Sequence, residues 1–130
     1  MAIWGLGTDI VEVARIEHSL SRGNSLIKRV LTPDEQKEMD LSTDPAAFLA
    51  KRFAAKEACA KAFGRGISAG LSFQHMKVVH DSYGKPEWHF TDTAAQWVKE
   101  QGISGSHLSI SDEKHYAVAT VILETESIKN

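Results

Sequence analysis

Residues 44–64 read DPAAFLAKRFAAKEACAKAFG and predict a long helix. Asp44 followed by Pro45 is typical of a helix start, because proline fits the first helical position, where its missing N–H costs nothing. Eight alanines between Ala46 and Ala62 favour the helical state. Gly64 is expected to cap the end, since glycine readily adopts the left-handed conformation found there.

The residues before this helix predict a strand and two shorter helices. Residues 2–11 alternate and are rich in β-formers, which favours a strand. A helix is expected from Val13 to Arg22, where Gly23 ends it. Thr32-Pro33-Asp34-Glu35 is a capping box and predicts a helix to about Asp40.

The second half of the chain predicts mainly strands. Strands are expected at about 75–80 and 86–90, joined by a turn through 81–84, and a helix follows from Thr91 or Asp92 to Gly102. A hairpin pairs 107–111 with 116–124. The order is strand, three helices, two strands, helix and two strands, which predicts an α+β fold with a mainly antiparallel sheet packed with helices.

Length and composition narrow the class of protein. The chain has 130 residues, 42% of them hydrophobic and 25% charged, so a single globular domain spanning 1–130 is expected. The net charge of −2 and the lack of a long apolar run argue against nucleic-acid and membrane partners. A single cysteine, Cys59, excludes an internal disulfide and a multi-cysteine zinc site, and is typical of a cytoplasmic protein.

Glu57 and Asp9 are the most informative charged residues. Glu57 shares a helix face with Phe53 and Lys61, which would place a carboxylate beside apolar side chains. Asp9 interrupts an apolar strand. Together they would suit Mg²⁺, which prefers carboxylate oxygens and often keeps substrate phosphates as its other ligands. The alternatives are a surface Glu–Lys pair four residues apart and a capped or bulged strand end.

Two segments of the chain are basic, which suggests localised anion sites or solvated helix faces. Cations that would hold phosphates near the two carboxylates are Arg52, Lys56, Lys61 and Arg65. Alternation places His107, Ser109 and Ser111 on one strand face, which is either a solvent face or a phosphate contact. The histidines show no metal-ligand spacing, and the chain has neither a Walker loop nor a Gly-x-Ser-x-Gly elbow.

Two longer stretches carry a family resemblance. Residues 5–16, GLGTDIVEVARI, and residues 52–64, RFAAKEACAKAFG, resemble motifs of the small bacterial 4′-phosphopantetheinyl transferases of the holo-acyl-carrier-protein synthase type. Gly84-Lys85-Pro86 and the strand 107–112 are supporting matches, and the resemblance covers nearly the whole chain. It implies the 4′-phosphopantetheinyl transferase fold and a role in fatty acid biosynthesis. The implied reaction transfers 4′-phosphopantetheine from coenzyme A to a serine of acyl carrier protein, leaving adenosine 3′,5′-bisphosphate.

The resemblance also implies roles for particular residues. Asp9 and Glu57 match the magnesium ligands. Glu57, directly or through a metal-bound water, is also the candidate base. Lys61 matches a pyrophosphate contact, and with Asp9 and Glu57 it completes the expected catalytic set. The coenzyme A contacts would be Lys61 together with Arg52, Gly84, Lys85, Pro86, His107 and Ser111.

Further implications concern the partners. Arg15 and Arg22, seven residues apart on one helix face, match the helix that docks the acidic carrier protein. Several relatives have histidine where this chain has Asp112, and an ionised aspartate donates nothing to a phosphate. The family assembles as a homotrimer with active sites between subunits, so exposed apolar residues are expected, with Trp88 and Phe73 as candidates.

Two other function classes compete with the transferase. A magnesium nuclease would also use two carboxylates and a lysine, but its usual Glu and Lys lie two apart on a strand, whereas Glu57 and Lys61 lie four apart on a helix. A non-catalytic module that binds coenzyme A or an acidic protein would bind without magnesium-dependent turnover.

Overall fold

The computed structural model describes residues 1–126; residues 127–130, which the single-domain prediction includes, lie outside the described residues. The fold class is confirmed, because every strand pair is antiparallel and helices pack on the sheets. The elements in chain order are β1 (Ala2–Glu12), α1 (Val13–Ser21), α2 (Ser25–Val30), α3 (Pro33–Asp40), α4 (Pro45–Phe63), the 3₁₀ turn η1 (Phe73–His75), β2 (Met76–His80), β3 (Pro86–Phe90), α5 (Asp92–Glu100), β4 (Ile103–Asp112) and β5 (Tyr116–Thr125).

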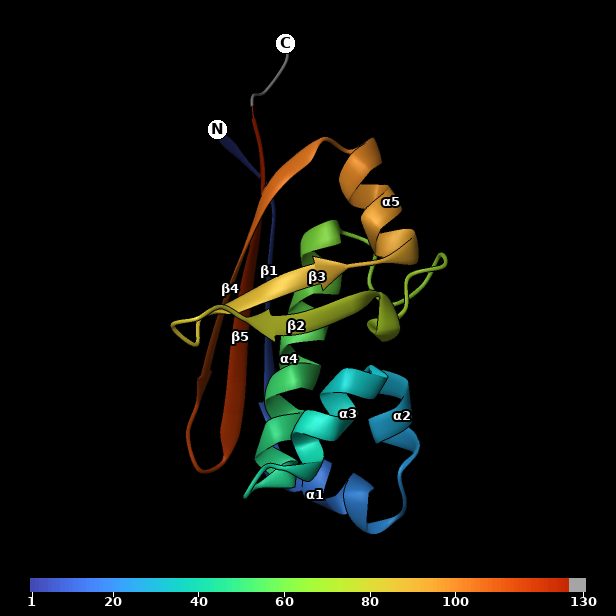
Figure 1. Cartoon of the computed structure of the whole chain (residues 1–130), viewed down its shortest axis with the longest axis vertical. Helices are drawn as coiled ribbons and strands as arrows, with labels where there is room; N and C mark the ends of the chain where they lie inside the picture. The colour runs from blue at the N-terminus through green and yellow to red at the C-terminus, as the bar shows by residue number, and fades with distance from the viewer. Residues whose placement is uncertain (127–130) are drawn as a thin grey trace.

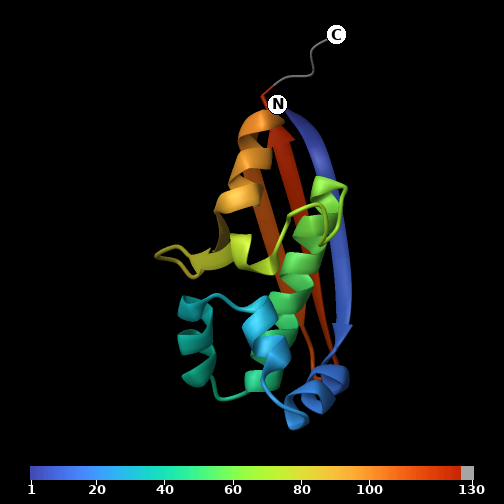
Figure 2. The same cartoon turned by 90° about the vertical axis from the view of Figure 1, so that its right-hand side faces the viewer.

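The strands form two separate sheets. One has the order β1-β5-β4, and the other is the hairpin β2-β3. Figure 1 shows the three-stranded sheet nearly edge-on, with the labelled helices on one side of it. Figure 2 looks from the helix side, where α4 crosses this sheet, α1 to α3 gather at one end and α5 lies at the other. The described part of the chain has no helix long and apolar enough to span a membrane.

Local capping determines the bounds of α3 and α4. Thr32 and Glu35 form both bonds of the predicted capping box. The Asp44 side chain accepts a hydrogen bond from the Ala47 N–H, and Gly64 ends α4 in the left-handed conformation. These predictions are confirmed. The predicted element order was wrong in two respects, since it omitted α2, a six-residue helix without a side-chain cap, and the short turn η1.

Helix α4 lies close against β1 because both elements present small residues. Gly5 and Gly7 face the backbone of Ala62 and Ala58, and a Cβ atom on either glycine would overlap a carbonyl oxygen of α4. On the neighbouring strand β5, Ala117 and Ala119 are fully buried. This close approach brings charged side chains of β1 and α4 to the same place.

Gly7→Ala is expected to lower the free energy of unfolding by at least about 2 kcal/mol, because the helix backbone would have to move. Gly105→Ala is the matched control: it lies in the same sheet, and its Cβ would meet nothing nearer than 3.7 Å. We expect that variant to stay within about 0.5 kcal/mol of the parent. Urea unfolding measures both, and equal midpoints for the two variants would contradict the packing argument.

Candidate active site

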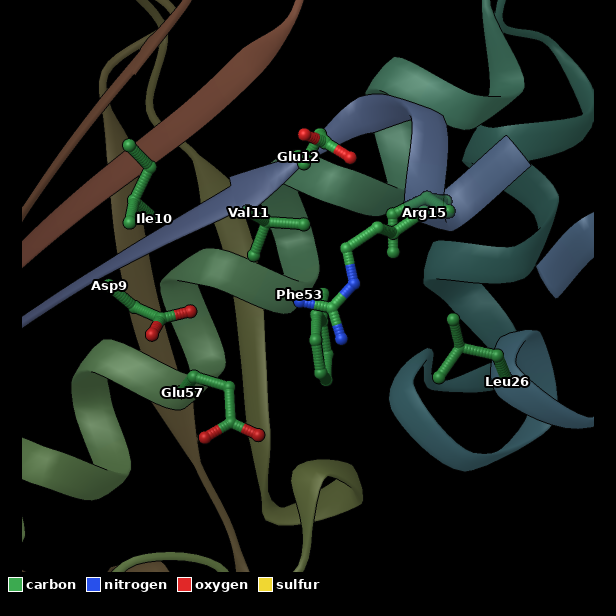
Figure 3. Close-up of a pocket in the computed structure, with 9 residues that line it drawn as sticks. Asp9, Ile10, Val11, Glu12, Arg15, Leu26, Phe53 and Glu57 are labelled. Atoms are coloured by element: carbon green, nitrogen blue, oxygen red, sulfur yellow. The ribbon is translucent and has the colours of Figure 1, made fainter. Parts of the chain in front are cut away.

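A pocket of about 380 Å³ lies where the end of β1 meets α1, α2 and α4. Figure 3 shows Asp9 and Glu57 projecting into the same space from β1 and α4. The residues that line the pocket are Asp9, Ile10, Val11, Glu12, Arg15, Ile16, Leu26, Phe53 and Glu57. The structure therefore brings together the two carboxylates that the sequence singles out.

Strand alternation explains why Asp9 faces α4. Gly7 and Val11 are buried on the helix-facing side of β1, and Asp9 lies between them on the same side. Its neighbours Thr8 and Ile10 face the opposite way and are exposed. A shift of one residue in register would turn Asp9 away from Glu57.

Lys61 lies one helical turn beyond Glu57 and pairs with Asp9. Its Nζ donates to Asp9 Oδ1 at 2.9 Å and to the carbonyl oxygen of Thr8 at 3.0 Å. The Lys61 side chain is 53% exposed and that of Asp9 18% exposed. The ion pair therefore joins β1 to α4 at the edge of the pocket.

The pKa of Glu57 is raised by burial and by the neighbouring Asp9 carboxylate, while Lys61 and Arg29 offset part of the rise. A carboxylate whose ionisation is opposed by burial and by a neighbouring negative charge favours a bound cation. Among the described residues no group of three or more His, Cys, Asp or Glu side chains is placed to hold a metal. The two carboxylates at this pocket suit a hard divalent ion that takes phosphate and water as its other ligands.

Arg15 and Arg22, the two arginines predicted to dock the carrier protein, lie in different surroundings. Arg15 lines the same pocket as Glu57, and Figure 3 shows its guanidinium directed towards Phe53. Arg22 is exposed at the C-terminal cap of α1 and is outside this lining.

A second pocket, of about 410 Å³, contains several of the predicted coenzyme A contacts. Arg52, Gly84 and Pro86 line it, and so does Asp112. Arg52 and Glu57 are five residues apart on α4 and so lie on different sides of the helix. Within one chain the second pocket is therefore separate from the Asp9–Glu57 pocket.

Arg52 is already engaged by carboxylates. Its two terminal nitrogens lie 3.2 Å from Glu35 and 3.1 Å from Glu38, and its guanidinium stacks on the Phe48 ring at 4.5 Å. Asp112 adds negative charge to the same lining. Any anion bound here would share Arg52 with these acidic groups.

The prediction that Lys56 holds phosphate was wrong. Lys56 is fully buried, and its Nζ donates to Glu35 Oε1 and the Val30 carbonyl, each at 2.6 Å, and to the Phe73 carbonyl at 3.1 Å. Arg65 is also away from the carboxylates, stacked on the Trp97 ring at 4.6 Å. The basic charge of this segment therefore includes structural as well as solvent-exposed cations.

His107 and Ser111 lie on the face of the three-stranded sheet opposite α4. They alternate with Leu108, which is buried on the inner face. The His107 imidazole lies 2.6 Å from Glu124 of β5. A single chain does not bring these two residues to either pocket, and Lys85 is exposed in the β2–β3 loop.

Some residues near the site were not found by sequence reasoning. Arg29, at the end of α2, lies over the Phe73 ring at 5.4 Å and within electrostatic reach of Glu57. Glu35 was recognised only as a helix cap, although it lies at the centre of the buried ion pairs. The expectation that Phe73 is an exposed interface residue was wrong: it is buried, packed against Phe53.

A pocket with two carboxylates and a lysine on a helix-backed antiparallel sheet is suited to metal-assisted phosphoryl transfer. Residues 5–121 match the model of the 4′-phosphopantetheinyl transferase superfamily. A holo-acyl-carrier-protein synthase from Idiomarina loihiensis is 88% identical over 126 residues, covering 97% of this chain and all of that protein.

Solved structures agree with this match. The Neisseria meningitidis holo-acyl-carrier-protein synthase superposes with a TM-score of 0.90 at 44% identity, covering 95% of this chain and 99% of that one. The Bacillus anthracis enzyme, in complex with CoA (3′,5′-ADP), gives a TM-score of 0.81 at 37% identity over 97% of this chain and 100% of that one. The chain belongs to the 4′-phosphopantetheinyl transferase superfamily and, within it, to the family of holo-acyl-carrier-protein synthases.

Proposed function

We propose that this chain is an enzyme that transfers the 4′-phosphopantetheine group of coenzyme A to a serine of apo acyl carrier protein. The serine oxygen forms a bond to the pantetheine-bearing phosphorus, and the bond from that phosphorus to adenosine 3′,5′-bisphosphate breaks. The observation that carries the proposal is that Asp9 and Glu57, on the two motifs that resemble the family, line one pocket, and that Lys61 pairs with Asp9. The coenzyme A ligand of the Bacillus anthracis relative supports the choice of donor.

Asp9 and Glu57 are the residues that would hold Mg²⁺. Burial and the Asp9 charge both raise the pKa of Glu57, and a bound cation would offset both effects. When bound, the ion would neutralise charge on the pyrophosphate as the leaving group departs. Manganese suits the same oxygen ligands.

The chain's own residues would bind and orient the reactants. Lys61 places an ammonium group at the pyrophosphate, where positioning and charge neutralisation dominate the chemistry. A Glu57 oxygen accepts the proton of the serine hydroxyl, directly or through one water. Arg15, which lines the pocket, and Arg22, at the C-terminal cap of α1, would face the acidic carrier protein.

Coenzyme A would extend from this pocket to residues supplied by a second subunit of a homotrimer. Arg52, Gly84 and Pro86 line the second pocket and, with Lys85, would hold the adenosine end of the donor. His107 and Ser111 lie on the outer face of the sheet, which would be the subunit interface. This arrangement accounts for predicted contacts that one chain keeps apart.

Uncovered apolar side chains on the outer face of the sheet support association with further copies of this chain, as the homotrimer requires. Leu6 and Ile10 on β1 are 61% and 63% exposed, and in the sheet Leu6 is aligned with Ile122, and Ile10 with Val118. On the same face, Glu124 Oε2 is buried and has no hydrogen-bond partner among the described residues. A neighbouring copy would cover these apolar side chains.

Leu6→Glu is expected to convert the trimer to a monomer and to lower transfer activity, because it places a charge in the proposed interface. Leu41→Glu is the control, since Leu41 is 87% exposed at the end of α3 and away from this sheet. Light scattering coupled to size exclusion measures the mass against the 14.3 kDa chain. A monomeric parent protein would contradict the trimer.

The remaining features of the proposal are one transferase domain and a cytoplasmic location. The family match over residues 5–121 and a continuous hydrophobic core support one domain. The single cysteine of the chain, Cys59, is free and buried, which suits a reducing compartment.

The proposed reaction is tested by following the nucleotide product. Adenosine 3′,5′-bisphosphate should form from coenzyme A only when apo acyl carrier protein is present, and EDTA should stop its formation until magnesium is restored. Release of this nucleotide without a carrier would indicate hydrolysis instead. Metal-dependent cleavage of plasmid DNA would favour the nuclease alternative, and coenzyme A binding without turnover would favour the binding module.

A further inference from the structure

Lys61 would have to contact two different groups, Asp9 in the free protein and the pyrophosphate of coenzyme A during the reaction. The inference drawn from this rests on the proposed function. In the structure the Lys61 ammonium group is bonded to Asp9 Oδ1 at 2.9 Å, so it occupies one of the two carboxylates assigned to the metal. In the proposed reaction the same group contacts the pyrophosphate of coenzyme A. Asp9 Oδ1 is therefore free to bind the metal only when Lys61 moves away from it.

We propose that Lys61 is the counter-ion of the metal site in the free enzyme, so that coenzyme A, by drawing Lys61 to its pyrophosphate, releases Asp9 to bind the divalent cation. Metal then binds weakly to the protein alone and more tightly in the presence of the donor. Because such coupling is reciprocal, metal strengthens coenzyme A binding by the same factor.

The geometry allows Lys61 to move. Its side chain is 53% exposed and its stem is flexible, whereas the fully buried Lys56 on the same helix is fixed by three hydrogen bonds. An exposed ion pair is weak, so a pyrophosphate with several negative charges competes well for the ammonium group. The only other bond from Lys61 Nζ among the described residues goes to the Thr8 carbonyl.

The Lys61 charge acts on both carboxylates. Burial and Asp9 raise the pKa of Glu57, whereas the charge of Lys61 lowers it. Lys61 therefore also favours the ionised form of Glu57, the second residue assigned to the metal. The other cations near this pocket are Arg15, which lines it, and Arg29, which acts on Glu57 from α2. Of the three, only Lys61 is bonded to a carboxylate assigned to the metal.

The test measures Mn²⁺ binding by electron paramagnetic resonance of free Mn²⁺, with the full-length protein and no carrier. Without coenzyme A, Lys61→Gln should bind Mn²⁺ about tenfold more tightly than the parent, because a positive charge beside the site is removed. Lys61→Arg keeps the charge and should bind as weakly as the parent. Lys99→Gln removes a charge from an exposed position on α5 and should leave the Mn²⁺ affinity unchanged.

Coenzyme A should then raise the Mn²⁺ affinity of the parent protein by more than that of Lys61→Gln, after subtraction of Mn²⁺ bound by coenzyme A alone. Equal Mn²⁺ affinity of Lys61→Gln and the parent would overturn the coupling while leaving metal-dependent transfer intact. If the parent binds no Mn²⁺ even with coenzyme A, and transfer proceeds in EDTA, the proposed metal site and this inference both fail.

Discussion

Glu57→Gln is expected to lower the rate of phosphopantetheine transfer by about a thousandfold or more, because it removes both a metal ligand and the proton acceptor. The substitution keeps the shape of the side chain. Folding raises the pKa of Glu57, which means that the ionised carboxylate lowers the free energy of unfolding. Replacing it with a neutral amide should therefore not lower the melting temperature. Transfer rates and thermal unfolding of the same preparation measure the two effects.

Glu12→Gln is the matched control for this variant. Glu12 lines the same pocket, but Figure 3 shows it directed away from Glu57. Its loss should leave the transfer rate near that of the parent. Full activity in Glu57→Gln, or an equal loss in both variants, would contradict the role assigned to Glu57.

The raised pKa of Glu57 also predicts how the transfer activity depends on pH. Metal binding and proton acceptance both need the Glu57 carboxylate ionised, so activity should fall as the pH drops through its pKa. Because burial and Asp9 raise that pKa, the loss should begin at a higher pH than for an ordinary glutamate.

Lys56→Met is expected to lower the free energy of unfolding by about 3–5 kcal/mol, because it leaves the Glu35 carboxylate buried without its closest cation. Glu35 is fully buried, and besides Lys56 it accepts from Arg52 and from the N–H groups of Thr32 and Val78. Lys56 also bonds to the carbonyls of Val30, the last residue of α2, and Phe73, the first residue of η1. Its loss therefore loosens several segments at once.

The ionised state of this pair follows from its contacts. Burial lowers the pKa of Lys56, and the Glu35 charge offsets part of this decrease. Three hydrogen-bond acceptors surround the Lys56 Nζ and favour its ammonium form. Burial opposes ionisation of Glu35 too, yet Lys56 and the backbone N–H groups lower its pKa overall. The stability that Glu35 contributes is thus present above the ordinary pKa of glutamate and is lost as the pH falls through the lowered value.

Lys77→Met provides the comparison for Lys56→Met. It breaks an exposed ion pair with Asp34, whose atoms lie 2.9 Å apart, and should change stability little. In the double variant Lys56→Met, Glu35→Gln the losses should be smaller than the sum of the single losses, because no charge is left unpaired. Similar unfolding midpoints for Lys56→Met and Lys77→Met would contradict the importance of the buried pair.

Local signals explain which parts of the fold could be predicted. Thr32, Glu35, Asp44 and Gly64 mark helix ends through bonds within a few residues, so α3 and α4 were predicted with nearly correct bounds. Helix α2 was missed because its six residues carry no side-chain cap and owe their helical state to packing. Two separate sheets could not be distinguished from one, since strand pairing depends on distant residues.

The candidate site was predicted in part for the same reason. Asp9 and Glu57 stand out because each is charged within an apolar pattern, and the structure places both at one pocket. Lys56 was misassigned because its partner Glu35 lies 21 residues away, and no local pattern separates a buried cation from an exposed one on a basic helix. The position of His107 and Ser111 on an outer sheet face depends on register, which the sequence of one strand does not determine.

The central claim is tested most directly by the intact mass of apo acyl carrier protein after incubation with this protein, coenzyme A and magnesium. We predict that the carrier gains the mass of one phosphopantetheine, that EDTA prevents the gain, and that a carrier with its acceptor serine replaced by alanine gains nothing. An unchanged mass, with folded protein and a carrier that a known transferase modifies, would contradict the proposed function.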